Sequence, residues 1–435
     1  MSVAAHAIHL SALPPIAPKN LEETGHRSSF LVELACKILF SGGTMSLASL
    51  SGRLALPISV ASDLADILKR ERLAEVKSGG DVRATYQFAL TDLGRDRARD
   101  FLHVSGYVGA APVTPAQYAD VAWKQTVQKI PVNASRMANA FDGVVLPPGL
   151  LDRLGPAVNS GRSIFLYGPS GTGKTFLAER LAGLLDGSIF IPRAIAVDSH
   201  VIRVFDPVCH NEIHIGEGLD SFGEILEGGP RYDRRFVLCE RPAIIAGGEL
   251  TLSMLDLSYD NGAGYYEAPL QLKANGGVFV IDDLGRQMVR PLDLFNRWIM
   301  PLERRVDYLT LRTGKKFQIP FDQIIVFSTN LEPRGLADEA FLRRLGYKIR
   351  IGHISPAEYV AICHQVCARL RMEFRAEAIR YLLEVEHERR DIPLCACHPN
   401  DILSRVEEIC RYRGLPPHMT RELIGDACRD YFTEL

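Results

Sequence analysis

Apolar residues recur every three or four positions through the first quarter of the chain, after a start interrupted by Pro14, Pro15 and Pro18. This period is typical of amphipathic helices that bury one face. Three helices are expected, at Ser28–Phe40, Ser46–Leu54 and Ser59–Arg72. Pro57 separates the last two, because proline disfavours continuation of a helix. The pattern therefore predicts a helical unit that follows a loose tail.

The period changes after the third helix. Leu73–Lys77 and Arg83–Leu90 have strand character on either side of Ser78–Asp81, which carries two glycines and predicts a hairpin. Thr91 can accept a backbone hydrogen bond and so cap a further helix that runs through Phe101. Helices followed by a two-stranded wing resemble a winged-helix domain.

Short apolar runs alternate with helices from about Asn139, which is typical of a sheet flanked by helices. From Ser355 onward the strand pattern stops, and Ala357–Arg371 and Ala376–His387 have helical spacing, which predicts a small all-helical domain. Five runs are expected to form one mostly parallel sheet, at Ser163–Tyr167, Ser188–Ile191, Val278–Ile281, Gln323–Phe327 and Tyr347–Ile351.

Composition narrows the class of protein. The 435 residues are 23% charged and 47% hydrophobic, which is typical of a soluble chain with two or three domains. A net charge of -2 provides no bulk attraction to nucleic acid. The apolar stretch Phe30–Phe40 contains Glu33 and Lys37 and is far too short to cross a membrane. Nine scattered cysteines favour a reducing compartment, so we expect a cytoplasmic protein without a secretory signal.

The strongest chemical motif is a P-loop, which lies between an apolar strand and the amphipathic helix Phe176–Leu185. Its glycines let the backbone turn with N–H groups facing inward, where a Cβ would fill the space that phosphates need. Lys174 can reach the β and γ phosphates, and the Thr175 hydroxyl can bind Mg²⁺. We therefore predict an ATP and Mg²⁺ site formed by Gly168, Pro169, Ser170, Gly171, Thr172, Gly173, Lys174 and Thr175.

Two carboxylates follow the strand Val278–Ile281 directly. Such pairs are common at strand ends without chemistry, but beside a P-loop they predict a Walker B element. Asp282 would then hold the metal, and Asp283 would polarise the attacking water. Asp283 stands where Glu is usual, and its side chain is shorter by one methylene. Either slower hydrolysis or a tighter site is therefore expected.

Three more residues are candidates for catalysis. Asn330 follows the strand Gln323–Phe327 and either orients the same water or forms a turn. Arg343 and Arg344 lie on an expected helix before the last strand, where they form either a solvated face or an arginine finger. A finger that contacts the γ-phosphate contributes on the order of 10³–10⁵ in rate.

In this order, the P-loop, the two aspartates, Asn330 and the arginine pair resemble an AAA+ ATPase domain. The resemblance implies a doubly wound parallel sheet, a C-terminal helical lid, and a homo-oligomeric ring, commonly a hexamer, in which the finger arginine reaches the nucleotide of a neighbour. The expected division is a flexible tail at 1–26, a winged-helix domain at 27–104, a linker and connecting helix at 105–130, an AAA+ ATPase α/β core at 131–353, and a helical lid domain at 354–435.

Three details qualify the resemblance. Glu303–Leu311 and Lys316–Pro320 alternate like the pre-sensor hairpin of the group that contains the MoxR proteins, magnesium chelatase and bacterial enhancer-binding activators. The run Ile281–Gly285 is also similar to helicase loaders and transposition helper ATPases. Many relatives carry a second sensor arginine near the start of a late helix, where this chain offers Asn400, unless Arg405 or another arginine substitutes.

Other features have two interpretations each. The set Cys363, His364, Cys367, Cys395, Cys397 and His398 forms a zinc site or, as we favour, contains cysteines buried as small apolar residues. Tyr265 and Tyr266 lie in a flexible loop that grips a threaded chain or, as we favour, are packed in the core. The region His200–Gly264 exceeds what the core requires and is expected to be an insertion of unknown role.

Charge decides the expected partner of the winged helix. Eleven basic and nine acidic residues leave it almost neutral, and Asp63 and Asp66 precede the basic end of its third helix. We therefore expect an ATPase that remodels a protein partner or adaptor selected by this domain. The alternatives are a regulator or loader that binds DNA under the control of ATP, and a nucleotide switch that hydrolyses ATP slowly or not at all.

Overall fold

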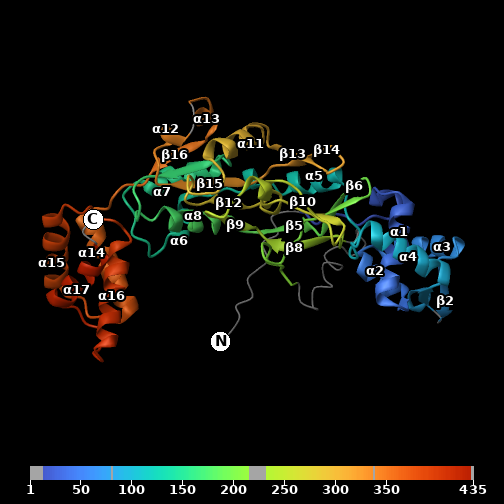
Figure 1. The fold of residues 1–435 in the computed structure, drawn as a ribbon, viewed down its shortest axis with the longest axis horizontal. Helices are drawn as coiled ribbons and strands as arrows, with labels where there is room; N and C mark the ends of the chain where they lie inside the picture. The colour runs from blue at the N-terminus through green and yellow to red at the C-terminus, as the bar shows by residue number, and fades with distance from the viewer. Residues whose placement is uncertain (1–12, 80–81, 215–231, 337–338, 433–435) are drawn as a thin grey trace.

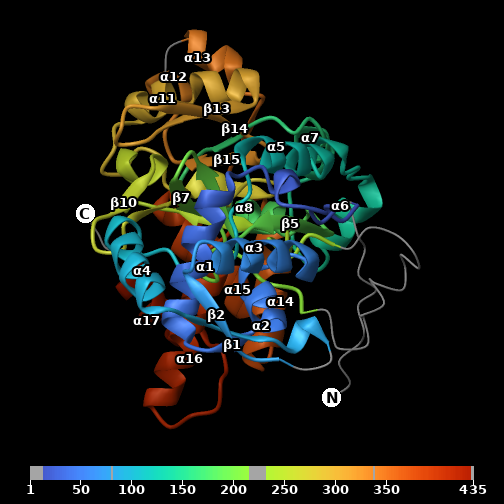
Figure 2. The ribbon, with the colours of Figure 1, turned by 90° about the vertical axis from the view of Figure 1, so that its right-hand side faces the viewer.

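The computed structural model describes residues 13–79, 82–214, 232–336 and 339–432. The N-terminal and C-terminal helices lie at opposite ends of the molecule, with the strands of the core between them (Figure 1). Figure 2 looks from the N-terminal end, so that α1 to α4 lie in front of the core. Parts of the expected tail, of the hairpin turn, of the insertion at 200–264 and of the segment before Arg343 fall outside the described residues.

The N-terminal unit combines four helices and a small antiparallel sheet of order β1-β3-β2. Thr91 caps α4 by accepting a hydrogen bond from the Gly94 N–H at 3.0 Å, as expected. The hairpin is confirmed, but the second strand begins later than predicted because Arg83–Thr85 forms a 3-10 turn. The elements are α1 (Ser28–Gly42), β1 (Met45–Ser46), α2 (Leu47–Leu54), α3 (Ile58–Arg70), β2 (Ala74–Ser78), β3 (Gln87–Leu90) and α4 (Asp92–Val104).

The core is built on a five-stranded parallel sheet of order β16-β4-β15-β12-β9, which confirms the predicted α/β class. Every strand runs in the same direction, so the carboxyl ends of all five meet at one edge of the sheet. The strands are β4 (Ile164–Tyr167), β9 (Ala243–Ala246), β12 (Val278–Ile281), β15 (Ile324–Thr329) and β16 (Tyr347–Arg350).

Helices cover both faces of this sheet. Alternate side chains of a strand point to opposite faces, so Ile164 and Leu166 of β4 pack with α7 and α8, whereas Phe165 packs on the other side with Phe295 and Trp298 of α11. Burial on both faces explains the nearly continuous apolar runs in the sequence. The helices around the sheet are α6 (Ala134–Ala140), α7 (Leu150–Asn159), α8 (Lys174–Ala182), α10 (Leu270–Lys273), α11 (Pro291–Arg304), α12 (Pro333–Leu336) and α13 (Glu339–Arg344).

One predicted strand of the sheet is wrong. The run at Ser188–Ile191 is a strand, β5 (Ser188–Pro192), but it pairs antiparallel with β8 (Phe236–Glu240) in a separate two-stranded sheet. The edge position next to β12 belongs instead to β9, where Val278 lies opposite Ala243. Both β5 and β8 are almost wholly buried, so their apolar pattern resembles that of a core strand. Apolar pattern shows that a strand forms but does not reveal its partner.

The insertion and the residues that flank it form a second sheet, of order β10-β11-β7-β6, against which the N-terminal unit packs. The Gly106 N–H donates to Ala263 O at 2.8 Å, and the Val113 N–H donates to Ala194 O at 2.9 Å. Ala194 also belongs to the same apolar cluster as the N-terminal helices. The elements are α5 (Pro115–Lys124), β6 (Ala194–Val197), β7 (His200–Arg203), β10 (Ser258–Asp260) and β11 (Tyr265–Glu267).

Two expectations for this region are resolved. Tyr265 and Tyr266 lie in β11, and Tyr266 is buried, so both belong to a strand and not to a flexible loop. The expected hairpin before β15 is confirmed, since β13 (Val306–Thr310) pairs antiparallel with β14 (Lys316–Pro320). The described end of the expected tail is also anchored, because the Asp233 N–H donates to Pro15 O at 2.8 Å.

From Ser355 onward, the described residues form helices joined by loops and contain no strand. Its first helix starts with a capping box in which Ser355 and Glu358 satisfy each other's backbone N–H groups. No described helix has the length and apolar character needed to span a bilayer. The helices are α14 (Pro356–Leu370), α15 (Ala376–Tyr381), the π-helical turn Leu382–His387, α16 (His398–Tyr412) and α17 (Arg421–Tyr431).

Candidate nucleotide site

The P-loop connects the end of β4 to the first turn of α8. Gly168, Gly171 and Gly173 all have positive φ angles, of 141°, 74° and 89°, which side chains rarely adopt. A Cβ on Gly168 would lie 2.0 Å from Ile351 O at the end of the neighbouring strand. The loop can therefore sit this close to the sheet only with glycine at its first position.

Lys174 is folded back into this loop. Its Nζ donates to Gly168 O at 3.0 Å and to Pro169 O at 2.7 Å, and its side chain is buried. Burial lowers the pKa of Lys174, while the nearby carboxylates of Asp283 and Asp282 act against that shift. The ammonium group of Lys174 is thus held by two neutral carbonyl groups. An anion in the loop would bind this cation more strongly.

Thr175 and Asp282 meet at the edge where the parallel strands end. The Thr175 hydroxyl lies 3.0 Å and 2.9 Å from the two carboxylate oxygens of Asp282, which follows β12. Hydroxyl and carboxylate oxygens are the hard ligands that Mg²⁺ prefers. The oxygen atoms of Thr175 and Asp282 therefore fit the predicted Mg²⁺. The fold brings these two residues together although they are 107 positions apart in the sequence.

Asp283 adopts a left-handed backbone conformation, with φ of 49°. Such a conformation is uncommon outside glycine, although Asp and Asn tolerate it better than most residues. Gln287 braces this turn, because its side chain donates to Asp282 O at 2.6 Å and accepts from the Gly285 N–H at 2.8 Å. Sequence reasoning missed Gln287, since nothing in the residue type signals such a role.

Asn330 follows β15, the strand between β4 and β12. It therefore lies at the same edge of the sheet as the P-loop and the two aspartates. Its neighbour Thr329 is buried and donates its hydroxyl to Leu284 O at 2.6 Å, which ties the turn after β12 to the end of β15.

The arginine pair lies apart from these residues, on α13. Arg343 has a side chain that is 76% exposed and donates to Glu339 on the same helix at 2.8 Å. Arg344 pairs with Glu303 at the end of α11. The structure thus brings the P-loop, Asp282, Asp283 and Asn330 to one edge of the sheet, and places Arg343 on the surface.

The C-terminal helices contact the P-loop through a segment to which sequence reasoning assigned no such role. The Cys397 N–H donates to Gly171 O at 3.1 Å, and the Cys395 thiol lies 3.6 Å from Ser170 O. A Cβ on Gly171 would lie 2.7 Å from the Cys397 sulfur. The loop glycine thus also makes room for the helical domain.

The cysteine and histidine cluster does not form a metal site within the described residues, where no group of three or more such ligands is arranged to hold an ion. Cys363 and Cys367 are buried in the apolar core of the helical domain. His364 instead stacks on Phe374, with ring centroids 3.5 Å apart. The interpretation of the cysteines as small buried apolar residues is supported.

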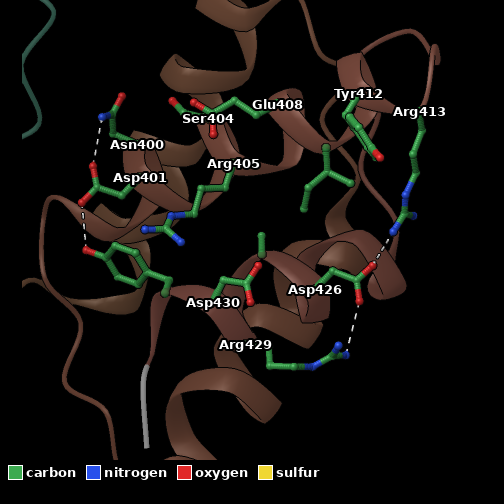
Figure 3. A pocket seen from close by; sticks show the side chains of 13 residues that line it. Asn400, Asp401, Ser404, Arg405, Glu408, Tyr412, Arg413, Asp426, Arg429 and Asp430 are labelled. Carbon is green, nitrogen blue, oxygen red and sulfur yellow. Dashed lines mark hydrogen bonds and ion pairs between the residues drawn. The ribbon is translucent and has the colours of Figure 1, made fainter.

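The candidates for a second sensor face another cavity. Asn400 and Arg405 line a cavity of about 900 Å³ between α16 and α17, which also contains Asp430 and Tyr412 (Figure 3). Asn400 accepts a hydrogen bond from Arg369, and the Arg405 guanidinium lies 5.1 Å from the centre of the Tyr431 ring. In this structure, the described contacts of both side chains are with the helical domain and not with the P-loop.

Residues 355–430 match a family described as a domain of unknown function, DUF8689. A comparison with curated proteins returned no significant match.

Solved structures with a related fold share little sequence with this chain. NtrX from Brucella abortus, in complex with ADP, is 12% identical over 69% of this chain and 56% of its own, with a TM-score of 0.39. A RuvB mutant from Thermotoga maritima is 13% identical over 66% of this chain and 71% of its own, with a TM-score of 0.37. This chain thus spans just over half of the NtrX chain. The scores are too low to support an argument about activity.

Proposed function

We propose that this chain is an AAA+ ATPase that binds ATP with Mg²⁺ and hydrolyses it in a homo-oligomeric ring. The observation that carries the proposal is the contact between Thr175 and Asp282 at the mouth of a P-loop whose lysine is folded onto backbone carbonyls. The P-loop, the ammonium group of Lys174 and the oxygen atoms of Thr175 and Asp282 thus lie at one edge of a parallel sheet. Ligands of α/β proteins commonly bind at this edge.

Each group in the site has a role in this proposal. Backbone N–H groups of the P-loop and the N-terminus of α8 bind the phosphates. Lys174 exchanges its carbonyl partners for phosphate oxygens, because charge-assisted hydrogen bonds are about twice as strong as neutral ones. Mg²⁺, bound through Thr175 and Asp282, would neutralise part of the phosphate charge. Asp283 accepts a proton from the attacking water, which Asn330 orients.

In the proposed ring, an arginine of the neighbouring subunit supplies a further positive charge to the γ-phosphate. Arg343 extends into solvent and is held by an exposed ion pair with Glu339, and such pairs contribute little to stability. It can therefore exchange Glu339 for the γ-phosphate of a neighbouring subunit at little cost. We assign the finger to Arg343 because Arg344 is engaged with α11.

A protein partner for the N-terminal unit is supported by the charges on α3. Asp66 is paired with Arg83 of the wing, and Asp63 is exposed on the same helix. Carboxylates on this surface would repel the phosphates of DNA. We therefore propose a protein substrate or adaptor as the partner that ATP hydrolysis remodels.

A second candidate function is a slow nucleotide switch, and one observation favours it. Asp283 combines a short side chain with the left-handed backbone described above, so its reach toward a bound water is fixed by the turn. A chain of this kind would bind ATP and change state without rapid turnover.

Binding of Mg·ATP to the Lys174→Ala variant tests the shared basis of both functions. Loss of the ammonium should weaken binding by about 10- to 100-fold, since hydrogen bonds to charged groups contribute about 1.5–3 kcal/mol each. Isothermal titration calorimetry measures the affinity. Lys348→Ala is the control, because Lys348 donates to Leu342 O and Leu345 O away from the P-loop. Equal affinity of the Lys174→Ala and original chains would refute the assignment of the site.

A further inference from the structure

A cavity of about 990 Å³ lies between the N-terminal unit and the core, and none of its lining residues belongs to the P-loop. Its walls come from the start of α1, from α4, from the turn between β6 and β7, and from the turn between β13 and β14. Pockets for small molecules commonly measure about 300–1,000 Å³ and often lie where domains meet. The size and position of this cavity match that class.

The floor of the cavity is apolar. Phe30 of α1 and Phe101 of α4 are half-buried against the N-terminal core, and Phe317 of β14 packs from the opposite wall. Leu93 at the start of α4 is 51% exposed at the rim. A ligand with an apolar body would cover these groups and remove them from water, which stabilises the complex.

Two arginines at the cavity, Arg27 and Arg97, form no ion pair within the described residues. Arg97 is flanked along α4 by Arg95, which pairs with Asp92, and by Arg99, which pairs with Asp96. For Arg97 the structure gives no such acid. Arg27, which precedes α1, forms no ion pair with a described acid, although its charge acts on Asp198 of the same lining. Both line the cavity and remain free to bind an anion.

The acids of the cavity are mostly neutralised. Glu33 lies 3.1 Å from Lys37, and Asp198 lies 2.5 Å from Lys315. Glu71, at the end of α3, is the carboxylate of the lining without an ion pair in the described chain. Two free guanidinium groups against one free carboxylate leave the cavity with a positive balance.

We propose that this cavity binds a small amphipathic carboxylate, whose apolar body covers the phenylalanines and whose anion pairs with Arg27 and Arg97. Charge complementarity and volume together define this ligand. A peptide is less well matched, because peptides are usually recognised along a sheet edge or a long groove, whereas this cavity has the volume of a small-molecule pocket. The proposal does not depend on ATP hydrolysis.

The test uses the full-length chain without nucleotide and two fluorescent probes of nearly equal shape. Anilinonaphthalene sulfonate carries an anion, and N-phenylnaphthylamine does not. We expect Arg27→Ala and Arg97→Ala each to weaken binding of the anionic probe by about 10-fold, since a charged hydrogen bond contributes about 1.5–3 kcal/mol, and to change binding of the neutral probe by less than about 2-fold. Arg99→Ala is the matched control on the same helix and should change neither.

Competition identifies the class of ligand. Decanoate should displace the anionic probe from the original chain but not from the double variant of Arg27 and Arg97, and decanol should displace it more weakly. Unchanged affinity for the anionic probe in the double variant would overturn the proposal, as would equal losses for both probes. Displacement by an acidic amphipathic peptide at lower concentration than decanoate would also overturn it. Lys174→Ala should bind both probes normally, which separates this result from the test of the nucleotide site.

Discussion

The backbone of Asp283 is the unusual feature of the site at the scale of single residues. Its φ of 49° fixes the direction of a carboxylate that lies beside Lys174 and immediately after Asp282. Strained conformations of this kind persist where the surroundings determine them, and they often occur at functional sites. Here the hydrogen bonds of Gln287 hold the turn around Asp283 in this conformation.

The Asp283→Asn variant separates binding from hydrolysis. Asn tolerates the left-handed conformation as well as Asp does, so the turn should be preserved while the general base is lost. We expect Mg·ATP affinity within about 2-fold of the original chain and turnover lower by about 10²–10⁴. Calorimetry and single-turnover hydrolysis give the two quantities. Turnover equal to that of the original chain would remove Asp283 from the mechanism.

His398 lies at the start of α16, next to the segment that contacts the P-loop. Its ring stacks on His387 with centroids 5.2 Å apart, and its Nδ1 is buried without a hydrogen-bond partner in the described structure. Burial, together with the charges of His387 and His353, lowers the pKa of His398 to about 4, and Asp401 opposes this shift only in part. A proton here would also oppose the helix dipole.

Because the pKa of His398 is low in the folded chain, we predict that the chain loses stability in mild acid. The unfolded chain takes up the proton near pH 6.5 and the folded chain only near pH 4, so between these values the unfolded state binds more protons and the free energy of unfolding falls as the pH falls. The loss reaches about 2 kcal/mol at pH 5, because each pKa unit corresponds to about 1.4 kcal/mol. In urea unfolding at pH 7 and pH 5, His398→Phe should reduce the difference between the two pH values.

The remaining pH dependence in that variant has an identified source, since burial also lowers the pKa of His387. His364→Phe is the control, because His364 is exposed on the same domain and stacks on Phe374. An unchanged pH dependence in His398→Phe would show that this histidine does not control acid stability.

The sequence predicted those parts of the site that are local. The P-loop is one continuous stretch, and the two aspartates follow a run that forms β12. It did not predict that the segment at Cys395 touches the P-loop, because Cys395 and Ser170 are 225 positions apart. The roles of Asn330, Arg343 and Arg344 remain predictions, as they depend on bound nucleotide and on a neighbouring subunit.

At the scale of elements, the strands were easier to predict than their partners. The run Ala243–Ala246 is only four residues long, and two of its residues are exposed, as befits an edge strand. All four of its residues are apolar, and this short run takes the edge position that β5 was expected to fill. Pairing depends on contacts between distant segments, which periodicity does not record.

The junction between α4 and the strand pair β2–β3 depends on one glycine. A Cβ on Gly94 would lie 1.9 Å from Leu73 O, and the same backbone oxygen accepts the Thr91 N–H at 3.0 Å. Glycine thus allows the first turn of α4 to pack directly on the chain that enters β2. The backbone atom in contact has little freedom to move.

We expect Gly94→Ala to destabilise the N-terminal unit by about 2 kcal/mol or more, in the range of overpacked core substitutions. Gly52→Ala is the matched control, since Gly52 lies in α2 and a Cβ there would have no contact within 4 Å among the described residues. It should be neutral or stabilising by up to about 1 kcal/mol, because alanine favours helix more than glycine does. Thermal unfolding measured by circular dichroism compares the two. Similar stability of both variants would contradict the described packing.

At the scale of the whole molecule, the N-terminal unit and the core are joined through shared packing. Ala194 of β6 and Val201 of β7 lie in the apolar cluster of the N-terminal helices. The buried Arg235 donates to Thr24 O at 3.1 Å and pairs with Asp233 at 2.8 Å, which ties the segment before α1 to the insertion. A partner held by the N-terminal unit would therefore be held at a fixed position relative to the core.

The position of Arg343 leads to a prediction about assembly. Its guanidinium is exposed on α13, and its described ion pair is with Glu339 of the same helix, not with a group of its own P-loop. If it acts on a neighbour, Arg343→Ala should bind Mg·ATP normally and lose about 10³-fold or more in turnover. Arg334→Ala, an exposed arginine on α12, should retain turnover.

Mixing two inactive variants tests whether the arginine acts between subunits. Lys174→Ala keeps Arg343 but binds ATP weakly, whereas Arg343→Ala binds ATP normally but lacks the guanidinium. In a mixed assembly, a Lys174→Ala subunit can supply its arginine to the intact P-loop of an Arg343→Ala neighbour, so hydrolysis should reappear on mixing and should rise with protein concentration. If Arg343 acted within its own subunit, no mixture would contain a complete site and turnover would stay at the level of the separate variants.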